Sequence, residues 1–169
     1  MTVSLFTFVD LYRRHLAAAD HLLTKGSEFA AAKGISEAEM LGWRLADDMH
    51  PLAFQLMVVT NFSLWWPARA AGLPELGAVD ETLDVAGFHA AFADARAKLA
   101  AFSADQFAGR DDVPLTHTLR ESMEFTLPSG QWLSVFATTN IAFHLSIAYA
   151  ILRMKGVPLG KSDLFAAGL

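Results

Sequence analysis

Cysteine does not occur anywhere in the 169 residues of this chain. Its absence excludes disulfide bonds, thiolate metal ligands and a cysteine nucleophile, which removes several classes of enzyme at once. A metal site in this protein would have to be built from histidine, aspartate, glutamate or asparagine side chains.

Charged residues are also scarce, since they make up 18% of the chain while hydrophobic residues make up 53%. Soluble domains average about 25% and about 45–50% respectively, so we expect some apolar surface to remain available for a partner. Lysine and arginine form no dense cluster, and the net charge is −5. Because nucleic-acid binding depends on clustered cations, we expect neither DNA nor RNA as a partner. The N-terminus lacks the pattern of a secretory signal, which predicts a cytoplasmic location.

One stretch, residues 125–152, contains no Asp, Glu, Lys or Arg. It is long enough to hold a membrane-spanning helix of about 20 residues. It also contains Gln131, Asn140 and His144, whose polar groups would be costly in lipid. We therefore expect a buried helix of a bundle and no membrane association.

The spacing of apolar residues predicts four helical stretches within a single domain that covers residues 1–169. A Ser-x-x-Glu pattern at Ser36 predicts the start of the second stretch. Pro51 lies inside that stretch and removes a backbone donor, which predicts either a kink at residues 47–50 or a break there. Glycine and proline in residues 72–80 predict a loop. The helices are predicted over residues 4–33, 37–71, 85–107 and 130–155.

Between Pro114 and Pro128 the helical spacing gives way to alternation, with apolar residues at odd positions and mostly polar residues at even ones. A period of two predicts a pair of strands that turns near residues 120–122. Because a two-stranded hairpin is weak alone, we expect it to pack against the helices. The predicted fold is all-α: an up-and-down-like four-helix bundle with a small β-hairpin before the last helix.

The last predicted helix carries an amide and an imidazole four residues apart, Asn140 and His144, in an otherwise apolar segment. Residues at this spacing share one helix face, so both side chains should point into the same space. His50 is the next candidate, because it follows Asp47 and Asp48 in a helix that we expect to pack against the last one. We expect the histidines outside this set to be surface or boundary residues, except that the hairpin histidine has no assigned role.

Two interpretations of these side chains stay open. In the first, His50, Asn140 and His144 hold a divalent metal with an open position for a water that the metal acidifies. An amide oxygen is a poor ligand for zinc or nickel, so a carboxylate from Asp47 or Asp48 would be needed to strengthen the site. In the second, Asn140 and His144 form a buried hydrogen-bonded pair that joins the second and fourth helices.

Other chemistries have less support. Ser146 lies two positions after His144 and would face away from it on a helix, which argues against a nucleophile and base pair. No glycine-rich phosphate-binding pattern occurs, so we expect no nucleotide cofactor. The aromatic residues Phe62, Trp65 and Trp66 lie at helical spacing, which is more typical of a core than of a pocket.

Three segments, residues 44–55, 140–153 and 156–163, resemble an uncharacterised bacterial family of unknown function within the DinB/YfiT-like superfamily. They contain the patterns Asn140-x-x-Phe143-His144 and Gly156-Val-x-x-Gly160. The resemblance covers nearly the whole chain, and it implies a four-helix bundle that is commonly dimeric.

The resemblance also implies where a metal would bind. In metal-binding members of the superfamily, one histidine comes from the second helix and two come from the last helix as His-x-x-x-His. Carried over by position, His50 stands for the first, Asn140 for the second and His144 for the third. Because the second ligand is an asparagine here, the resemblance implies a degenerate metal site. The chemistry of the superfamily is metal-dependent hydrolysis or thiol transfer.

Taken together, these features predict a ligand-binding or interaction protein of unknown biochemical function. Its expected partners are a second copy of the chain and a small molecule, and no bound cofactor is expected. The alternative is a metal-dependent hydrolase or thiol transferase that uses His50 and His144 with zinc, nickel or manganese.

Overall fold

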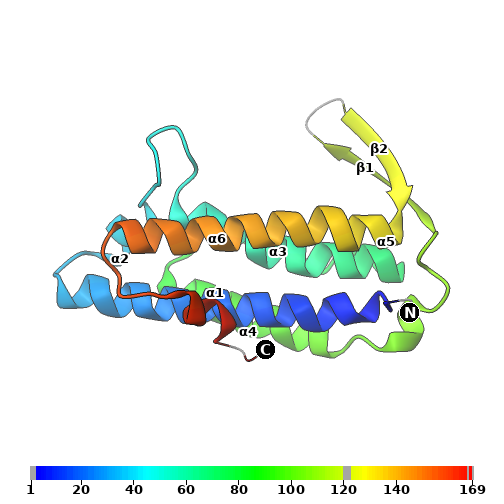
Figure 1. Cartoon of the computed structure of the whole chain (residues 1–169), viewed down its shortest axis with the longest axis horizontal. Coiled ribbons are helices and arrows are strands. Elements are labelled where there is room, and N and C mark those ends of the chain that lie inside the picture. Colours follow the sequence, from blue (N-terminus) through cyan, green and yellow to red (C-terminus); the bar gives the residue numbers. More distant parts are fainter. Residues whose placement is uncertain (1–2, 120–122, 167, 169) are drawn as a thin grey trace.

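A computed structural model describes residues 3–119, 123–166 and 168 of the chain. Its body is a bundle of four long helices, and a two-stranded antiparallel hairpin rises from one end of it (Figure 1). The helices are α1 (Phe6–Ala32), α3 (Leu52–Ala71), α4 (Val85–Ala100) and α6 (Thr138–Met154), and the strands are β1 (Pro114–Leu119) and β2 (Met123–Pro128). This arrangement confirms the predicted all-α bundle with a small hairpin before the last helix.

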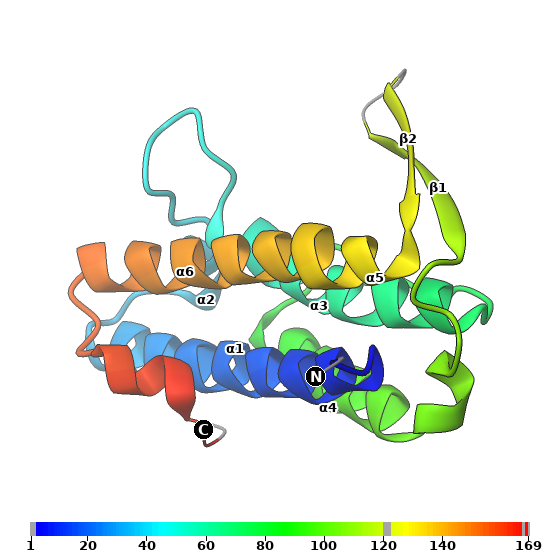
Figure 2. The same ribbon diagram turned by 45° about the vertical axis from the view of Figure 1, so that its right-hand side comes forward.

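The helices form two layers, with α3 and α6 in one and α1 and α4 in the other (Figure 2). Apolar side chains from all four helices fill the space between the layers and are almost completely buried. Each such side chain contributes about 1.5–3 kcal/mol relative to an exposed one, so this core stabilises the bundle. Its large members include Tyr12, Leu16, Leu56, Phe88, Phe92, Leu99 and Leu133.

The helices do not alternate in direction, so the predicted up-and-down order is wrong. After α3 the chain runs back along that helix, because Trp65 Nε1 donates to the Gly77 carbonyl at 3.1 Å and Asn61 Nδ2 donates to the Val79 carbonyl at 3.0 Å. The helix α4 therefore begins near the start of α3 and runs parallel to it (Figure 1). Residues 72–84 can cover this distance because an extended residue advances about 3.3 Å and a helical one only about 1.5 Å.

The predicted second helix is two helices. The short helix α2 (Glu37–Leu41) begins as expected, since the Ser36 hydroxyl accepts a hydrogen bond from the Glu39 backbone N–H at 3.2 Å. Pro51 has extended backbone angles and stands directly before α3, so it marks a break and not a kink. A proline lacks the N–H that a helix interior needs, but it is tolerated where a helix begins.

The segment between these two helices, residues 42–51, projects from the bundle on the same side as the hairpin (Figure 1). Its ends are held together, because the Leu52 backbone N–H donates to the Trp43 carbonyl at 2.8 Å. The candidate residue His50 lies in this projecting loop.

The last helix is continuous but not regular. It begins with α5 (Ser129–Gln131), widens into the π-helical segment η2 (Trp132–Ala137) and continues as α6. Within this segment the Leu133 carbonyl accepts hydrogen bonds from the hydroxyls of Tyr12 at 2.7 Å and Thr138 at 2.8 Å. Burial raises the pKa of Tyr12, which keeps its hydroxyl protonated as a donor. The helix was predicted from its sequence, and the π-helical segment was not.

Two short 3-10 helices were also not predicted as such. The third helix was predicted to end at residue 107 but ends at Ala100. The 3-10 helix η1 (Ala104–Phe107) follows it after a turn. In this turn the Gln106 side-chain oxygen accepts a hydrogen bond from the Ser103 N–H at 2.8 Å. The second, η3 (Lys161–Phe165), packs on α1 near the end of the chain.

Within the described residues, one helix, Ser129–Met154, is long and apolar enough to cross a membrane when judged by length and composition alone. In the structure this helix packs against α3 and α1 as a member of the bundle.

Candidate functional site

Asn140 and His144 lie on α6 and share one face of it, as their spacing predicted. Both side chains are half-buried. His144 points toward α3, where it meets the buried side chain of Gln55. The two helices are therefore joined by a polar contact inside an otherwise apolar interface.

The hydrogen bonds of Gln55 decide which nitrogen of His144 carries the proton. Gln55 Nε2 donates to the His50 carbonyl at 3.0 Å, so Gln55 Oε1 must accept the 2.7 Å hydrogen bond from His144 Nδ1. Nδ1 therefore carries the proton, and Nε2 of the neutral ring keeps a lone pair. Among the described residues, Nε2 has no hydrogen-bond partner. Such a lone pair can accept a hydrogen bond from a ligand or bind a metal.

The His144 ring is also hard to protonate. Burial, and then the nearby charge of His50, lower the pKa of His144 from 6.5 to about 4. A buried imidazolium loses hydration, and a second cation beside it adds repulsion. The ring is therefore neutral near pH 7.

Asn140 does not bond to His144, so the predicted hydrogen-bonded pair is wrong. Asn140 Nδ2 donates to the Phe136 carbonyl of its own helix at 2.8 Å. The link between the two helices that this pair was expected to make is made instead by Gln55. A glutamine inside the apolar run that begins at Leu52 was the available signal for this partner, because a polar group in such a run needs a hydrogen bond.

His50 is exposed in the loop before α3 and not on a helix, as had been expected. Its ring stacks on Phe54 with centroids 3.7 Å apart and planes 12° apart. The same Phe54 ring meets His144 edge-on at 6.0 Å. The two imidazoles thus pack against one phenyl ring, while Asp47 and Asp48 are exposed earlier in the loop.

These donors do not fit a three-ligand metal site. In the part of the chain that the structure describes, no group of three or more His, Cys, Asp or Glu residues could hold a metal ion. The third donor would have to be Asn140, whose amide is a weak ligand for zinc or nickel and whose nitrogen is already bonded to its own helix. The residues His50 and His144 alone make an incomplete ligand set.

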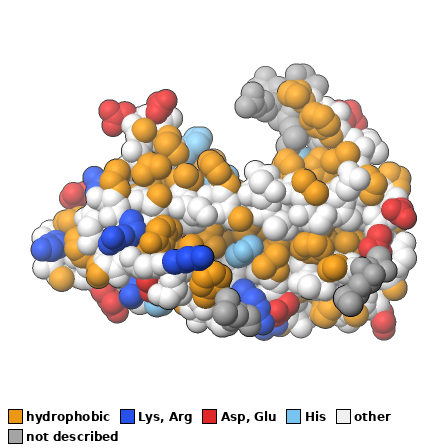
Figure 3. All heavy atoms as spheres, viewed as in Figure 1, with side chains coloured by type: hydrophobic (Ala, Val, Ile, Leu, Met, Phe, Trp, Pro, Cys, Tyr) orange, Lys and Arg blue, Asp and Glu red, His pale blue; other side chains and the backbone are white. Residues whose placement is uncertain are grey.

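The loop of residues 42–51 and the hairpin rise from the same side of the bundle and leave an open gap between them above the last helix (Figure 3). Eight large hydrophobic side chains are exposed among the described residues. Six of them belong to the two projections and to the last helix, and we call five of these, all except Met154 at the end of that helix, the apolar trough. They are Leu45, Met123, Phe125, Val135 and Phe143.

The hairpin packs on the helices through a polar and aromatic cluster. Arg69 Nη1 donates to His117 Nδ1 at 2.9 Å, so His117 carries its proton on Nε2. Burial, and then the positive charge of Arg69, lower the pKa of His117. Its ring meets Trp66 edge-on at 5.1 Å, and Trp132 Nε1 donates to the Leu115 carbonyl at 2.8 Å. The unassigned hairpin histidine therefore holds β1 to α3.

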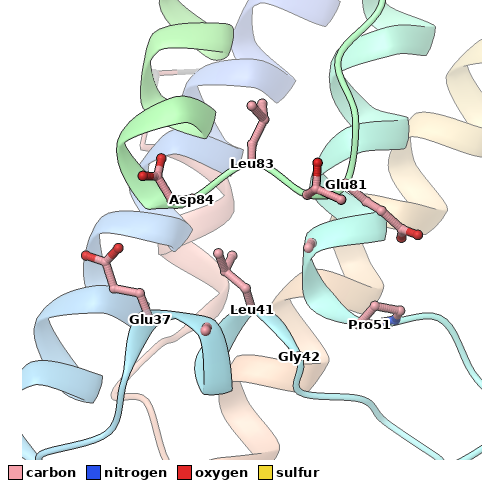
Figure 4. A pocket seen from close by; sticks show the side chains of 10 residues that line it. Glu37, Leu41, Gly42, Pro51, Glu81, Leu83 and Asp84 are labelled. Carbon is pink, nitrogen blue, oxygen red and sulfur yellow. The ribbon is translucent and has the colours of Figure 1, made fainter.

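A separate pocket with a volume of about 330 Å³ lies where α2, the start of α3 and the segment before α4 meet (Figure 4). The carboxylates of Glu37, Glu81 and Asp84 lie around it. Asp84 accepts from the Gly87 N–H at 2.7 Å and so serves to cap α4. The predicted site residues do not line this pocket, so it is a different place from the His144 site.

Three histidines outside the site are half-buried, in agreement with their expected boundary positions. His21 bonds to Asp163 at 2.8 Å, and His89 bonds to Asp20. His15 has a buried Nδ1 without a hydrogen-bond partner among the described residues, and burial lowers its pKa.

Comparison with known proteins agrees with this geometry. Residues 6–165 match the model of a family described as a domain of unknown function, DUF1993. The crystal structure of a DinB family member protein from Shewanella denitrificans is similar to the chain, with a TM-score of 0.83 and 25% sequence identity. The match covers 95% of this chain and 90% of that one. No curated protein matches the chain.

Proposed function

Because the chain belongs to the DUF1993 family of unknown function and has a DinB-like fold, we propose that it is an interaction protein that pairs with a second copy through the apolar trough. The observation that carries this proposal is that the loop of residues 42–51, the hairpin and the last helix carry six of the eight exposed large hydrophobic side chains among the described residues. Val135 is 62% exposed and Phe143 is 55% exposed, although both lie on a central helix of the bundle. Large apolar side chains left exposed on a bundle often mark an interaction site.

The charge of this face favours a second copy as the partner. A two-fold interface is formed by the same surface patch on both subunits. Charged residues within that patch would therefore lie close to charges of the same sign on the other subunit. The chain carries a net charge of −5, but residues 125–152 contain no charged residue at all. These residues form most of β2 and the last helix, and they can therefore meet their own copy without repulsion.

The shape of the face supports the same pairing. The hairpin rises beyond the bundle (Figure 1), and its strand β2 exposes Met123 and Phe125. A two-fold arrangement would place the hairpin of one copy against the last helix of the other. Residues that are exposed in one chain would then be buried by the pair.

Light scattering coupled to size exclusion tests this proposal on Phe143→Glu and on a matched control, Phe165→Glu. Both phenylalanines are exposed, but Phe165 lies on η3, away from the trough. We expect wild type and the control to show twice the chain mass of 18.4 kDa. An unpaired charge at an apolar interface should weaken the Phe143→Glu dimer by about 100-fold or more. A monomeric wild type, or an undisturbed Phe143→Glu dimer, would show that the proposal is wrong.

Ligand binding at His144 is the second candidate function. It is favoured by the fixed proton on Nδ1, which leaves Nε2 as an acceptor beside the rings of Phe54 and Phe143. The ligand would be a small molecule with a hydrogen-bond donor next to an apolar part. A metal-dependent hydrolase or thiol transferase has less support, because His50 and His144 lack a strong third ligand among the described residues.

A further inference from the structure

A second hollow lies at the base of the hairpin, away from His144. Its volume is about 450 Å³, and it is an open hollow bordered by the end of α3, the loop that follows and strand β1. The φ of +71° at Gly72, which a glycine adopts without strain, turns the chain there and brings this loop back over α3. Besides Gly72, the wall of the hollow is formed by Trp66, Arg69, Leu73, Glu75, Leu115 and Thr116.

Arg69 is the cation among the described residues of this wall. Its Nη1 donates to the neutral His117, and its Nη2 donates to a carboxylate oxygen of Glu75 at 2.8 Å. The guanidinium carbon lies 5.4 Å from the centre of the Trp66 ring. Arg69 is thus held in place by an imidazole and an indole, and it presents one edge to a carboxylate.

The carboxylate now on Arg69 is weakly held. The Glu75 side chain is 66% exposed and belongs to a loop, whereas the Arg69 side chain is 30% exposed. Exposed ion pairs of this kind contribute little, because water and salt screen them and a flexible side chain must be ordered. A carboxylate brought by a ligand with additional apolar contacts would displace Glu75 into solvent.

Such contacts are present in the wall. Leu73 and Leu115 supply apolar surface, whereas Trp66 is only 2% exposed. The Trp66 Nε1–H is buried without a hydrogen-bond acceptor in the part of the chain that the structure describes. A donor this deeply buried is closed to a ligand in the hollow, so the apolar contacts come from Leu73 and Leu115.

We propose that this hollow binds a small organic carboxylate with an apolar body, whose carboxylate replaces that of Glu75 on Arg69. Burial, and then the charge of Arg69, lower the pKa of His117, so the guanidinium is the positive charge that a single carboxylate would meet in this wall. The planar guanidinium matches the two oxygens of a carboxylate. This proposal concerns different residues from the trough and from His144.

Nuclear magnetic resonance titrations of the full chain with hexanoate, hexanamide and acetate test the proposal. We expect hexanoate to shift the backbone amide signals of Gly72, Leu73 and Thr116 and to bind at least ten times more tightly than the other two. Hexanamide lacks the charge, and acetate lacks the apolar body. Equal binding of either compound, or no shift with hexanoate, would overturn the proposal.

Variants separate the role of the ion pair from the stability of the hairpin. Glu75→Gln removes the competing carboxylate and should tighten hexanoate binding about two- to fivefold, which is the worth of an exposed ion pair. Glu81→Gln, an exposed glutamate elsewhere, should leave it unchanged. Arg69→Gln should weaken binding at least tenfold. Unchanged or weaker binding in Glu75→Gln would overturn the proposal even if Arg69→Gln disturbed the hairpin.

Discussion

His144 shows how a neighbour that is remote in the sequence sets the chemistry of a residue. Its ring would titrate near pH 6.5 in isolation, and burial and His50 lower its pKa to about 4. Gln55 fixes the proton on Nδ1, because its own amide nitrogen is engaged with the His50 carbonyl. The His144 ring is therefore uncharged, and its Nε2 is a hydrogen-bond acceptor on an apolar face.

At this scale we predict a specific titration of His144. Nuclear magnetic resonance should show a neutral ring with its proton on Nδ1 at pH 7 and protonation near pH 4. The unfolded chain binds this proton near pH 6.5, so the free energy of unfolding should fall as pH drops from about 6.5 to about 4. Replacing His144 with Gln should remove this part of the fall.

The matched change is Gln55→Leu, which takes away the acceptor and leaves the imidazole in place. It should release the ring to either neutral form and destabilise the chain by about 1–3 kcal/mol, because a buried donor loses its partner. Protonation of wild-type His144 near pH 6.5, or a proton on Nε2 at pH 7, would contradict the prediction.

At the scale of elements, the last helix depends on a side chain from the first. The π-helical segment Trp132–Ala137 interrupts the regular hydrogen-bonding pattern. The Tyr12 hydroxyl from α1 donates to the Leu133 carbonyl within it, and it lies 3.0 Å from the Thr138 hydroxyl. The irregularity of one helix is therefore compensated by the packing of another.

We predict that Tyr12→Phe lowers the free energy of unfolding by about 0.5–1.5 kcal/mol, since it removes a buried hydrogen bond and little volume. Urea denaturation measures the change. Tyr149→Phe is the control, because Tyr149 is half-buried and its hydroxyl has no hydrogen bond among the described residues. It should change stability by less than about 0.5 kcal/mol. If both changes lowered the free energy of unfolding equally, the hydrogen bond of the Tyr12 hydroxyl would not be the source of the stabilisation.

At the scale of the whole molecule, the end of the chain is tied to its beginning. Asp163 on η3 accepts hydrogen bonds from the Gly160 N–H at 2.7 Å, from His21 at 2.8 Å and from Lys25 at 3.0 Å. These bonds, of which the backbone bond is the largest cause, hold the pKa of Asp163 well below its usual 3.8. The carboxylate therefore holds η3 against α1.

We predict that Asp163→Asn destabilises the chain by about 1–2 kcal/mol at pH 7, because it removes charge-assisted hydrogen bonds. The contribution is present above the pKa of the unfolded aspartate and is lost as pH falls below it toward the folded pKa. Thermal unfolding at pH 7 and near pH 3 measures this difference. Asp94→Asn, which breaks an exposed pair with Lys98, should cost less than about 0.5 kcal/mol. A loss that stays the same at both pH values would contradict the assignment.

The existence of the helices and of the hairpin followed from the sequence, because the period of apolar residues is a local property. Asn140 and His144 share a face for the same reason, and the absence of cysteine limited the chemistry directly. The start of α2 could also be predicted, since the Ser-x-x-Glu pattern that caps it spans only four residues.

The direction of α4, the break at Pro51 and the exposed position of His50 were decided only in the tertiary structure. The same holds for Gln55 as the partner of His144 and for Arg69 as the partner of His117. These two polar contacts join residues that lie 89 and 48 positions apart and meet only when the bundle packs. The local sequence determines which faces are apolar, whereas the packing of those faces determines which polar groups meet, because a polar group buried between helices must find its partner there.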